Sequence, residues 1–88
     1  MQRITRTHLD AKAQTINSMT KSPVESYTNG KANKGNYHIS CAYGGYCLHR
    51  MCNESGGVSD VFSTGHVPAR ELAGLMSAYT AGLYDATR

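Results

Sequence analysis

Hydrophobic residues recur at helical spacing near the start of the chain. Leu9, Ala13 and Ile16 are separated by three or four positions, and polar residues fill the gaps. Thr7-His8-Leu9-Asp10 places a hydroxyl three residues before a carboxylate, which is a variant of the capping box. The pattern predicts a short amphipathic helix over 7–19, and Ser22-Pro23 should end it because proline cannot donate a backbone hydrogen bond.

A second helical pattern lies near the end of the chain. Pro68 stands where a first helical turn tolerates proline, and a stripe of apolar residues at helical spacing follows it. The stripe consists of Leu72, Leu75, Met76, Tyr79 and Leu83. We therefore expect a second helix over 68–84 that covers a sheet.

The middle of the chain alternates in character, as strands do. Residues 37–42 lead into Gly44-Gly45, a pair suited to the positive φ angles of a two-residue hairpin turn. That turn would pair Tyr43 with Tyr46, Cys41 with Leu48, Ile39 with Arg50 and Tyr37 with Cys52, and these eight residues would form the core face. The opposite face, called here the outer face, would carry His38, Ser40, Ala42, Cys47, His49 and Met51.

A third strand is expected over 58–63, after the turn Glu54-Ser55-Gly56-Gly57, and its register stays open because one residue more or less would exchange Val61 and Phe62 between faces. Residues 20–36 are polar, turn-prone and carry lysines, so they should form a basic surface loop. The expected fold is α+β, with the order helix, three antiparallel strands, helix (αβββα), in two layers with both helices on one face. Residues 1–88 form a single domain in this interpretation.

Composition narrows the classes of function. A chain of 88 residues buries only about 60 to 65% of the surface that its unfolded form exposes, so a deep enclosed active site is not expected. The formal charge of +3 permits an acidic partner without the dense basic patch of a dedicated nucleic-acid binder. The first residues contain no apolar run of the length that a signal peptide or membrane span needs, and three cysteines fit reduced thiols in a cytosol better than a disulfide scaffold.

The cysteines and histidines are the candidate chemistry. Structural zinc sites usually show paired ligands such as Cys-x2-Cys, which this chain lacks, and the hairpin register sends Cys41 and Cys52 to the core but His38, Cys47 and His49 to the outer face. Cys47 is the thiol expected to react, yet no third group that would orient a Cys-His pair is evident. We therefore predict no enzyme, no catalytic residue, no metal and no cofactor, while a small zinc-binding domain stays open as an alternative.

A binding surface is the preferred interpretation. His38, Cys47, His49 and Met51 on the outer face, with Lys31 and Lys34 of the loop, are the residues expected to contact a partner. A host or phage protein is the expected partner, without a membrane. A nucleic-acid- or nucleotide-binding module using the same lysines is the main alternative, and pairing of two copies at the strand edge near Tyr37 or Phe62 also stays open.

Several short segments together resemble a known group of proteins. These segments are Ile16-Asn17-Ser18-Met19-Thr20-x-Ser22-Pro23, Gly35-Asn36-Tyr37-His38-Ile39-Ser40, Ala42-Tyr43-Gly44-Gly45-Tyr46-x-Leu48-x-Arg50, Asn53-x-x-Gly56-Gly57 and Arg70-Glu71-Leu72. They resemble short accessory proteins of unassigned activity that tailed bacteriophages and prophages encode. The resemblance implies an accessory protein in the cytoplasm of the bacterial host that binds a macromolecule, with inhibition of a host process such as a defence system as the expected role.

Overall fold

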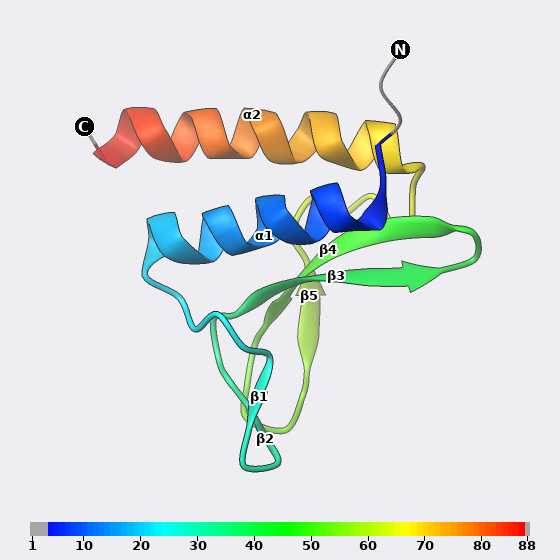
Figure 1. The fold of residues 1–88 in the computed structure, drawn as a ribbon. Coiled ribbons are helices and arrows are strands. Elements are labelled where there is room, and N and C mark those ends of the chain that lie inside the picture. Colours follow the sequence, from blue (N-terminus) through cyan, green and yellow to red (C-terminus); the bar gives the residue numbers. More distant parts are fainter. Residues whose placement is uncertain (1–3, 88) are drawn as a thin grey trace.

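The computed structural model describes residues 4–87 as two helices, two small sheets and their connections (Figure 1). The elements are α1 (Arg6–Thr20), β1 (Tyr27–Thr28), β2 (Lys31–Ala32), β3 (Tyr37–Ala42), β4 (Gly45–Met51), β5 (Val58–Asp60) and α2 (Ala69–Thr87). β3, β4 and β5 form an antiparallel sheet in that order, and β1 pairs with β2 in a separate hairpin. The expected α+β class and three-stranded antiparallel sheet are confirmed, whereas the β1–β2 hairpin was not predicted.

Helix α1 begins earlier than its sequence pattern predicted. Thr5, not Thr7, is the N-cap: its hydroxyl accepts from the His8 N–H, and its own N–H donates to Nδ1 of His8 (3.2 Å). A histidine thus takes the place of the carboxylate that usually completes a capping box. The sequence prediction had assigned this role to Thr7 and Asp10 instead. The helix ends at Lys21 in a left-handed conformation (φ 56°), two residues before Pro23.

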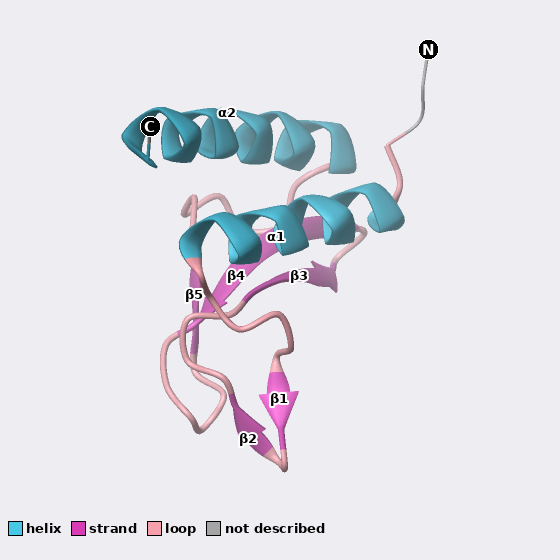
Figure 2. Cartoon of the chain, turned by 60° about the vertical axis from the view of Figure 1, so that its left-hand side comes forward, coloured by secondary structure: helices cyan, strands magenta, loops and turns pink. Residues whose placement is uncertain are grey.

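Both helices pack on the same side of the three-stranded sheet (Figures 1 and 2). The fully buried centre joins Leu9 and Ile16 of α1, Leu48 of β4, and Leu72 and Met76 of α2, each with 0% exposure. Burial of each such side chain stabilises the fold by about 1.5 to 3 kcal/mol. The described residues contain no helix of the length and apolar character needed to cross a membrane.

Asn17 fastens α1 to the edge of the sheet. Its side chain is fully buried; its Oδ1 accepts from the Tyr37 N–H (2.8 Å) and its Nδ2 donates to the Tyr37 C=O (3.0 Å). The amide therefore takes the place of a neighbouring strand at Tyr37, and this part of the β3 edge is already paired.

The β3–β4 turn consists of Tyr43-Gly44, one residue earlier than expected. Both have positive φ (55° and 75°), as a type I′ turn requires, and Ala42 pairs with Gly45. The predicted partners are therefore wrong by two positions, and Tyr37 lies opposite Arg50 instead of Cys52. The assignment to faces survives for residues 37–42 and 46–51, because a shift of two preserves the alternation, but Tyr43, which was assigned to the core face, lies in the turn.

Strand β5 is shorter than the expected 58–63. It pairs Val58 with Met51 and Asp60 with His49, and then the chain turns. Val61 and Phe62 follow the strand, so their side chains do not have to point to opposite faces of the sheet, and both pack against the core. This resolves the register that the sequence left open.

Candidate interaction surface

A row of aromatic side chains crosses the outer face, which is the face of the sheet opposite the helices. We call it the aromatic row: His38, His49, His66 and Tyr43. Its ring centroids follow one another at 5.8 Å (His38 to His49), 6.1 Å (His49 to His66) and 5.9 Å (His66 to Tyr43), each pair edge to face. His38 and His49 are direct cross-strand partners, not the diagonal neighbours predicted from the sequence.

His66 joins the row from the segment before α2, and no local sequence pattern predicts this position. Val67 forms a bridge with Tyr46 through two backbone hydrogen bonds (2.8 and 2.9 Å), which brings this segment alongside β4. The Oγ atom of Ser40, on the outer face, then lies within hydrogen-bond distance of Nε2 of His66 (3.1 Å). The contact depends on the pairing of Tyr46 with Val67, which are 21 positions apart, and the sequence around His66 does not alternate as a strand does.

Gly45 allows this close approach. A Cβ atom at Gly45 would stand 3.0 Å from His66 C and from the N and O atoms of Val67. The space belongs to the crossing backbone, so a side chain here would push the segment away. The glycine at the start of β4 thereby determines where His66 lies.

The environment of the paired histidines, His38 and His49, favours their neutral forms. Burial, followed by the neighbouring His49, lowers the pKa of His38. Burial also lowers the pKa of His49, with His66 adding to the effect and Asp60 opposing it. Nδ1 of His38 lies 3.1 Å from the amide oxygen of Asn36, so this nitrogen is the donor and Nε2 remains as an acceptor.

Two outer-face residues predicted to meet a partner are instead buried. Met51 is 3% exposed and Cys47 is 1% exposed. Burial raises the pKa of the Cys47 thiol to about 11, with a hydrogen bond to Asp60 and its negative charge as further causes. The prediction of a reactive Cys47 is therefore wrong: an outer-face position does not imply solvent exposure here, because the thiol is buried and contacts Asp60, where β5 ends and the following turn begins.

Asp60 holds that turn in place. Its carboxylate accepts from the N–H groups of Phe62 (3.2 Å), Ser63 (3.0 Å) and Gly65 (2.7 Å). Burial opposes ionisation, but these bonds and the Cys47 thiol together lower the pKa of Asp60. The carboxylate is therefore engaged in structure and is not presented to a partner.

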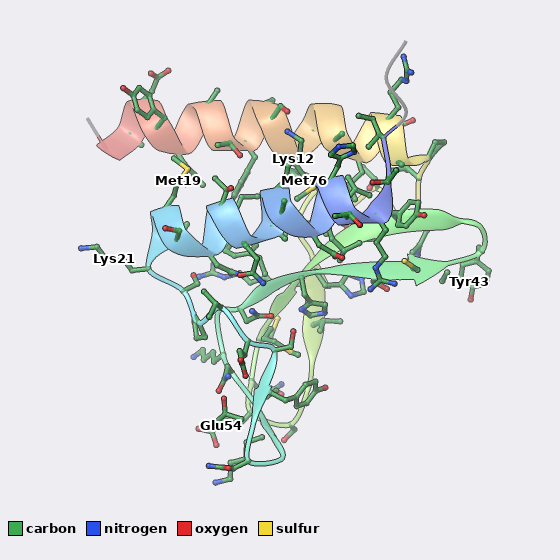
Figure 3. The ribbon with its side chains drawn as sticks, viewed as in Figure 1. Lys12, Met19, Lys21, Tyr43, Glu54 and Met76 are labelled. Atoms are coloured by element: carbon green, nitrogen blue, oxygen red, sulfur yellow. The ribbon has the colours of Figure 1, made fainter. Side chains whose placement is uncertain are left out.

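The two lysines lie apart from the aromatic row. Lys31 belongs to the β1–β2 hairpin, which projects away from the sheet, while Tyr43 marks the tip of the β3–β4 turn at the other end (Figures 2 and 3). Lys34 lines a hollow with Arg50. The structure therefore brings His38 and His49 together, whereas Lys31 lies in the β1–β2 hairpin and Lys34 lines a hollow that contains neither histidine.

The remaining cysteines also differ from prediction. Cys41 and Cys52 were expected in the core, but both are exposed, as is Tyr43 (98%). Cys41 occupies a helix-facing position near the turn, and Cys52 follows the last residue of β4, so being on the core face of the ribbon does not bury either one. Within residues 4–87, no three His, Cys, Asp or Glu side chains are arranged to hold a metal ion.

Comparisons with known proteins assign no family to this chain. The aromatic row is built from two strands and one long-range bridge, and its two strand histidines, His38 and His49, are half-buried and have lowered pKa values. No protein-family model, curated protein or solved structure matches the chain.

Proposed function

We propose that this chain is a non-enzymatic binding protein that docks another protein on its outer face through the aromatic row. The observation that carries the proposal is the continuous series of four rings, which ends in a tyrosine that is 98% exposed. Tyrosine supplies large contact area with few rotatable bonds, and it is enriched among the residues that dominate protein interfaces. The row thus offers an aromatic anchor beside neutral groups that can form hydrogen bonds.

Charge favours a protein partner over nucleic acid at this surface. The outer-face positions of the three strands are 38, 40 and 42, then 45, 47, 49 and 51, then 58 and 60, and none is Lys or Arg. Nucleic-acid surfaces need cations along the phosphate backbone. Depletion of charge is instead typical of the centre of a protein interface.

The environment of Cys47 supports the non-enzymatic part of the proposal. A nucleophilic cysteine acts as the thiolate, and a buried thiol with a pKa of about 11 is protonated at neutral pH. Its hydrogen-bond partner, Asp60, is already engaged by backbone N–H groups. The resemblance to phage accessory proteins favours a role in the cytoplasm of a bacterial host, where docking would block a host process such as a defence system.

Affinity purification from a bacterial lysate tests the proposal. The tagged protein is incubated with lysate, with and without nuclease, and retained proteins are identified by mass spectrometry. We expect a specific protein that survives nuclease and is lost with Tyr43→Ala and with His66→Ala. Tyr84→Ala removes an exposed tyrosine of α2, on the other side of the sheet, and should retain the partner.

Two outcomes would contradict the proposal. Retention of the same partner by both Tyr43→Ala and His66→Ala would show that another surface binds it. Capture that disappears entirely with nuclease, or that falls steeply as salt rises, would favour nucleic acid instead.

A further inference from the structure

A hollow of about 470 Å³ lies at the far end of β4 from the Tyr43 turn. It is lined by Lys34 and Gly35 from the segment before β3, and by Arg50, Met51 and Cys52 from the end of β4 and beyond. Its volume is in the range of about 300 to 1,000 Å³ that small-molecule sites occupy. The sequence prediction assigned Lys34 to the same surface as the histidines, but the fold gives it a different neighbour, Arg50.

Arg50 is held in one orientation at this hollow. Its Nε donates to the Gly35 carbonyl oxygen (3.4 Å), and its guanidinium carbon lies 5.0 Å from the centre of the Tyr37 ring. Stacking on the ring and one hydrogen bond from Nε leave the two terminal amino groups of the fork without a partner among residues 4–87. A planar fork fixed in this way matches the paired oxygens of a phosphate or carboxylate.

No acidic side chain neutralises this pair of cations. The hollow has no Asp or Glu in its lining, and within residues 4–87 neither Lys34 nor Arg50 forms an ion pair. Two cationic residues therefore line one cavity, and cationic residues around a cavity raise the local concentration of anions. Gly35 (φ +94°) adds no side chain, and a Cβ atom there would come 3.9 Å from Nη2 of Arg50.

We propose that this hollow binds the phosphate group of a nucleotide or of a nucleic-acid strand end. Arg50 would grip two phosphate oxygens, Lys34 would supply the second charge, and the remaining volume would take the sugar and base, because the hollow is larger than a phosphate alone. A phosphate is favoured over a carboxylate because its greater charge suits two cations. The site is separate from the aromatic row and does not depend on the proposed docking of a protein.

Titration of the intact protein with defined probes tests the inference. Inorganic phosphate, AMP, adenosine and a 5′-phosphorylated hexanucleotide are each followed by amide chemical shifts and by calorimetry in phosphate-free buffer. We expect AMP and phosphate to shift the amides of residues 34–35 and 50–52, and adenosine to leave them unchanged. A hexanucleotide that binds far more tightly than AMP, with steep salt dependence, assigns the phosphate to a strand; equal affinity assigns it to a free nucleotide.

Substitutions at the hollow give the decisive comparison. Arg50→Gln should weaken AMP binding about tenfold or more, since hydrogen bonds to charged groups are worth about 1.5 to 3 kcal/mol. Lys34→Glu places a carboxylate beside Arg50 on an exposed side chain and should abolish binding without disturbing the fold. Lys31→Gln removes the same charge from the neighbouring hairpin, and Tyr43→Ala alters the aromatic row; both should bind AMP like the native chain.

The inference fails under either of two results. It fails if neither phosphate nor AMP shifts the hollow's amides at millimolar concentration. It also fails if Lys34→Glu binds AMP as tightly as Lys31→Gln does, because binding would then reflect general charge and not this hollow.

Discussion

Replacing Asn17 with alanine should remove the clamp between α1 and the edge of the sheet. The buried amide satisfies both the N–H and the C=O of Tyr37, at 2.8 and 3.0 Å, and alanine leaves both groups buried without partners. Each orphaned group costs about 1 to 3 kcal/mol, so we expect the two together to lower the free energy of unfolding by about 2 to 6 kcal/mol. A chain of this length has a total of about 4 to 13 kcal/mol, which makes the loss a large fraction.

Urea denaturation followed by circular dichroism measures this loss. With a slope of about 1 to 1.5 kcal/mol per molar, the midpoint should fall by at least about 1.3 M. Asn33→Ala is the matched control: Asn33 also donates two hydrogen bonds, to the Glu25 C=O (2.9 Å) and the Thr28 hydroxyl (2.8 Å), but water can replace them at the exposed hairpin. We expect it to cost less than about 1 kcal/mol.

The outcome also bears on self-association. With Asn17 removed, the Tyr37 backbone becomes an unpaired strand edge, so the variant should associate at high concentration in sedimentation experiments while the native chain does so less. An Asn17→Ala variant whose midpoint matches that of Asn33→Ala would refute the reasoning, because the two buried hydrogen bonds would then contribute no more than exposed ones.

Three further results are expected. Gly45→Ala should destabilise the fold by about 1 to 3 kcal/mol, because its Cβ meets the Val67 backbone at 3.0 Å, whereas Gly74→Ala, on an open helical position, should stabilise it by about 0.5 to 1 kcal/mol; thermal melts that rank them in the reverse order would contradict the packing argument. The thiol of Cys47 should resist alkylation at pH 8 until denaturant is added, and labelling in the native state at the rate of the two exposed thiols would count against its burial. Because the pKa values of His38 and His49 are lowered in the folded chain, the unfolded chain binds more protons around and below the ordinary value of 6.5, so stability should fall as the pH drops from about 7 to values below 6.5. A His38→Gln/His49→Gln double variant that shows the same fall would exclude these imidazoles as its source.

The elements of the fold could be predicted because their signals are local. Helical stripes and alternating residues lie within each element, so α1, α2 and the β3–β4 hairpin were found with small errors at their ends. The predicted register was wrong because Tyr43-Gly44 forms the turn in place of Gly44-Gly45. Tyrosine is uncommon at positive φ, so the sequence favours the glycine pair as the turn. The β1–β2 hairpin was hidden for a similar reason, since two-residue strands carry almost no alternation.

The candidate site was harder to predict because it depends on contacts between distant segments. His38 and His49 were found from the hairpin alone. His66 was not, because only the Tyr46–Val67 bridge brings it to the outer face. Burial of Cys47 and Met51 depends likewise on how the rest of the chain packs around β4, which alternation along one hairpin cannot reveal.

The β3–β4 turn, held by the contact of Gly45 with the Val67 backbone, has a consequence for the kinetics of the proposed docking. The chain is fixed as far as Gly45 by the crossing Val67 backbone, so Tyr43 projects from a tip that is already ordered before any partner arrives. Docking would then immobilise little more than one side chain, at about 0.5 to 1.5 kcal/mol, instead of a whole loop. Encounter would need no slow rearrangement, and differences in affinity among partners would arise mainly from how long each complex lasts.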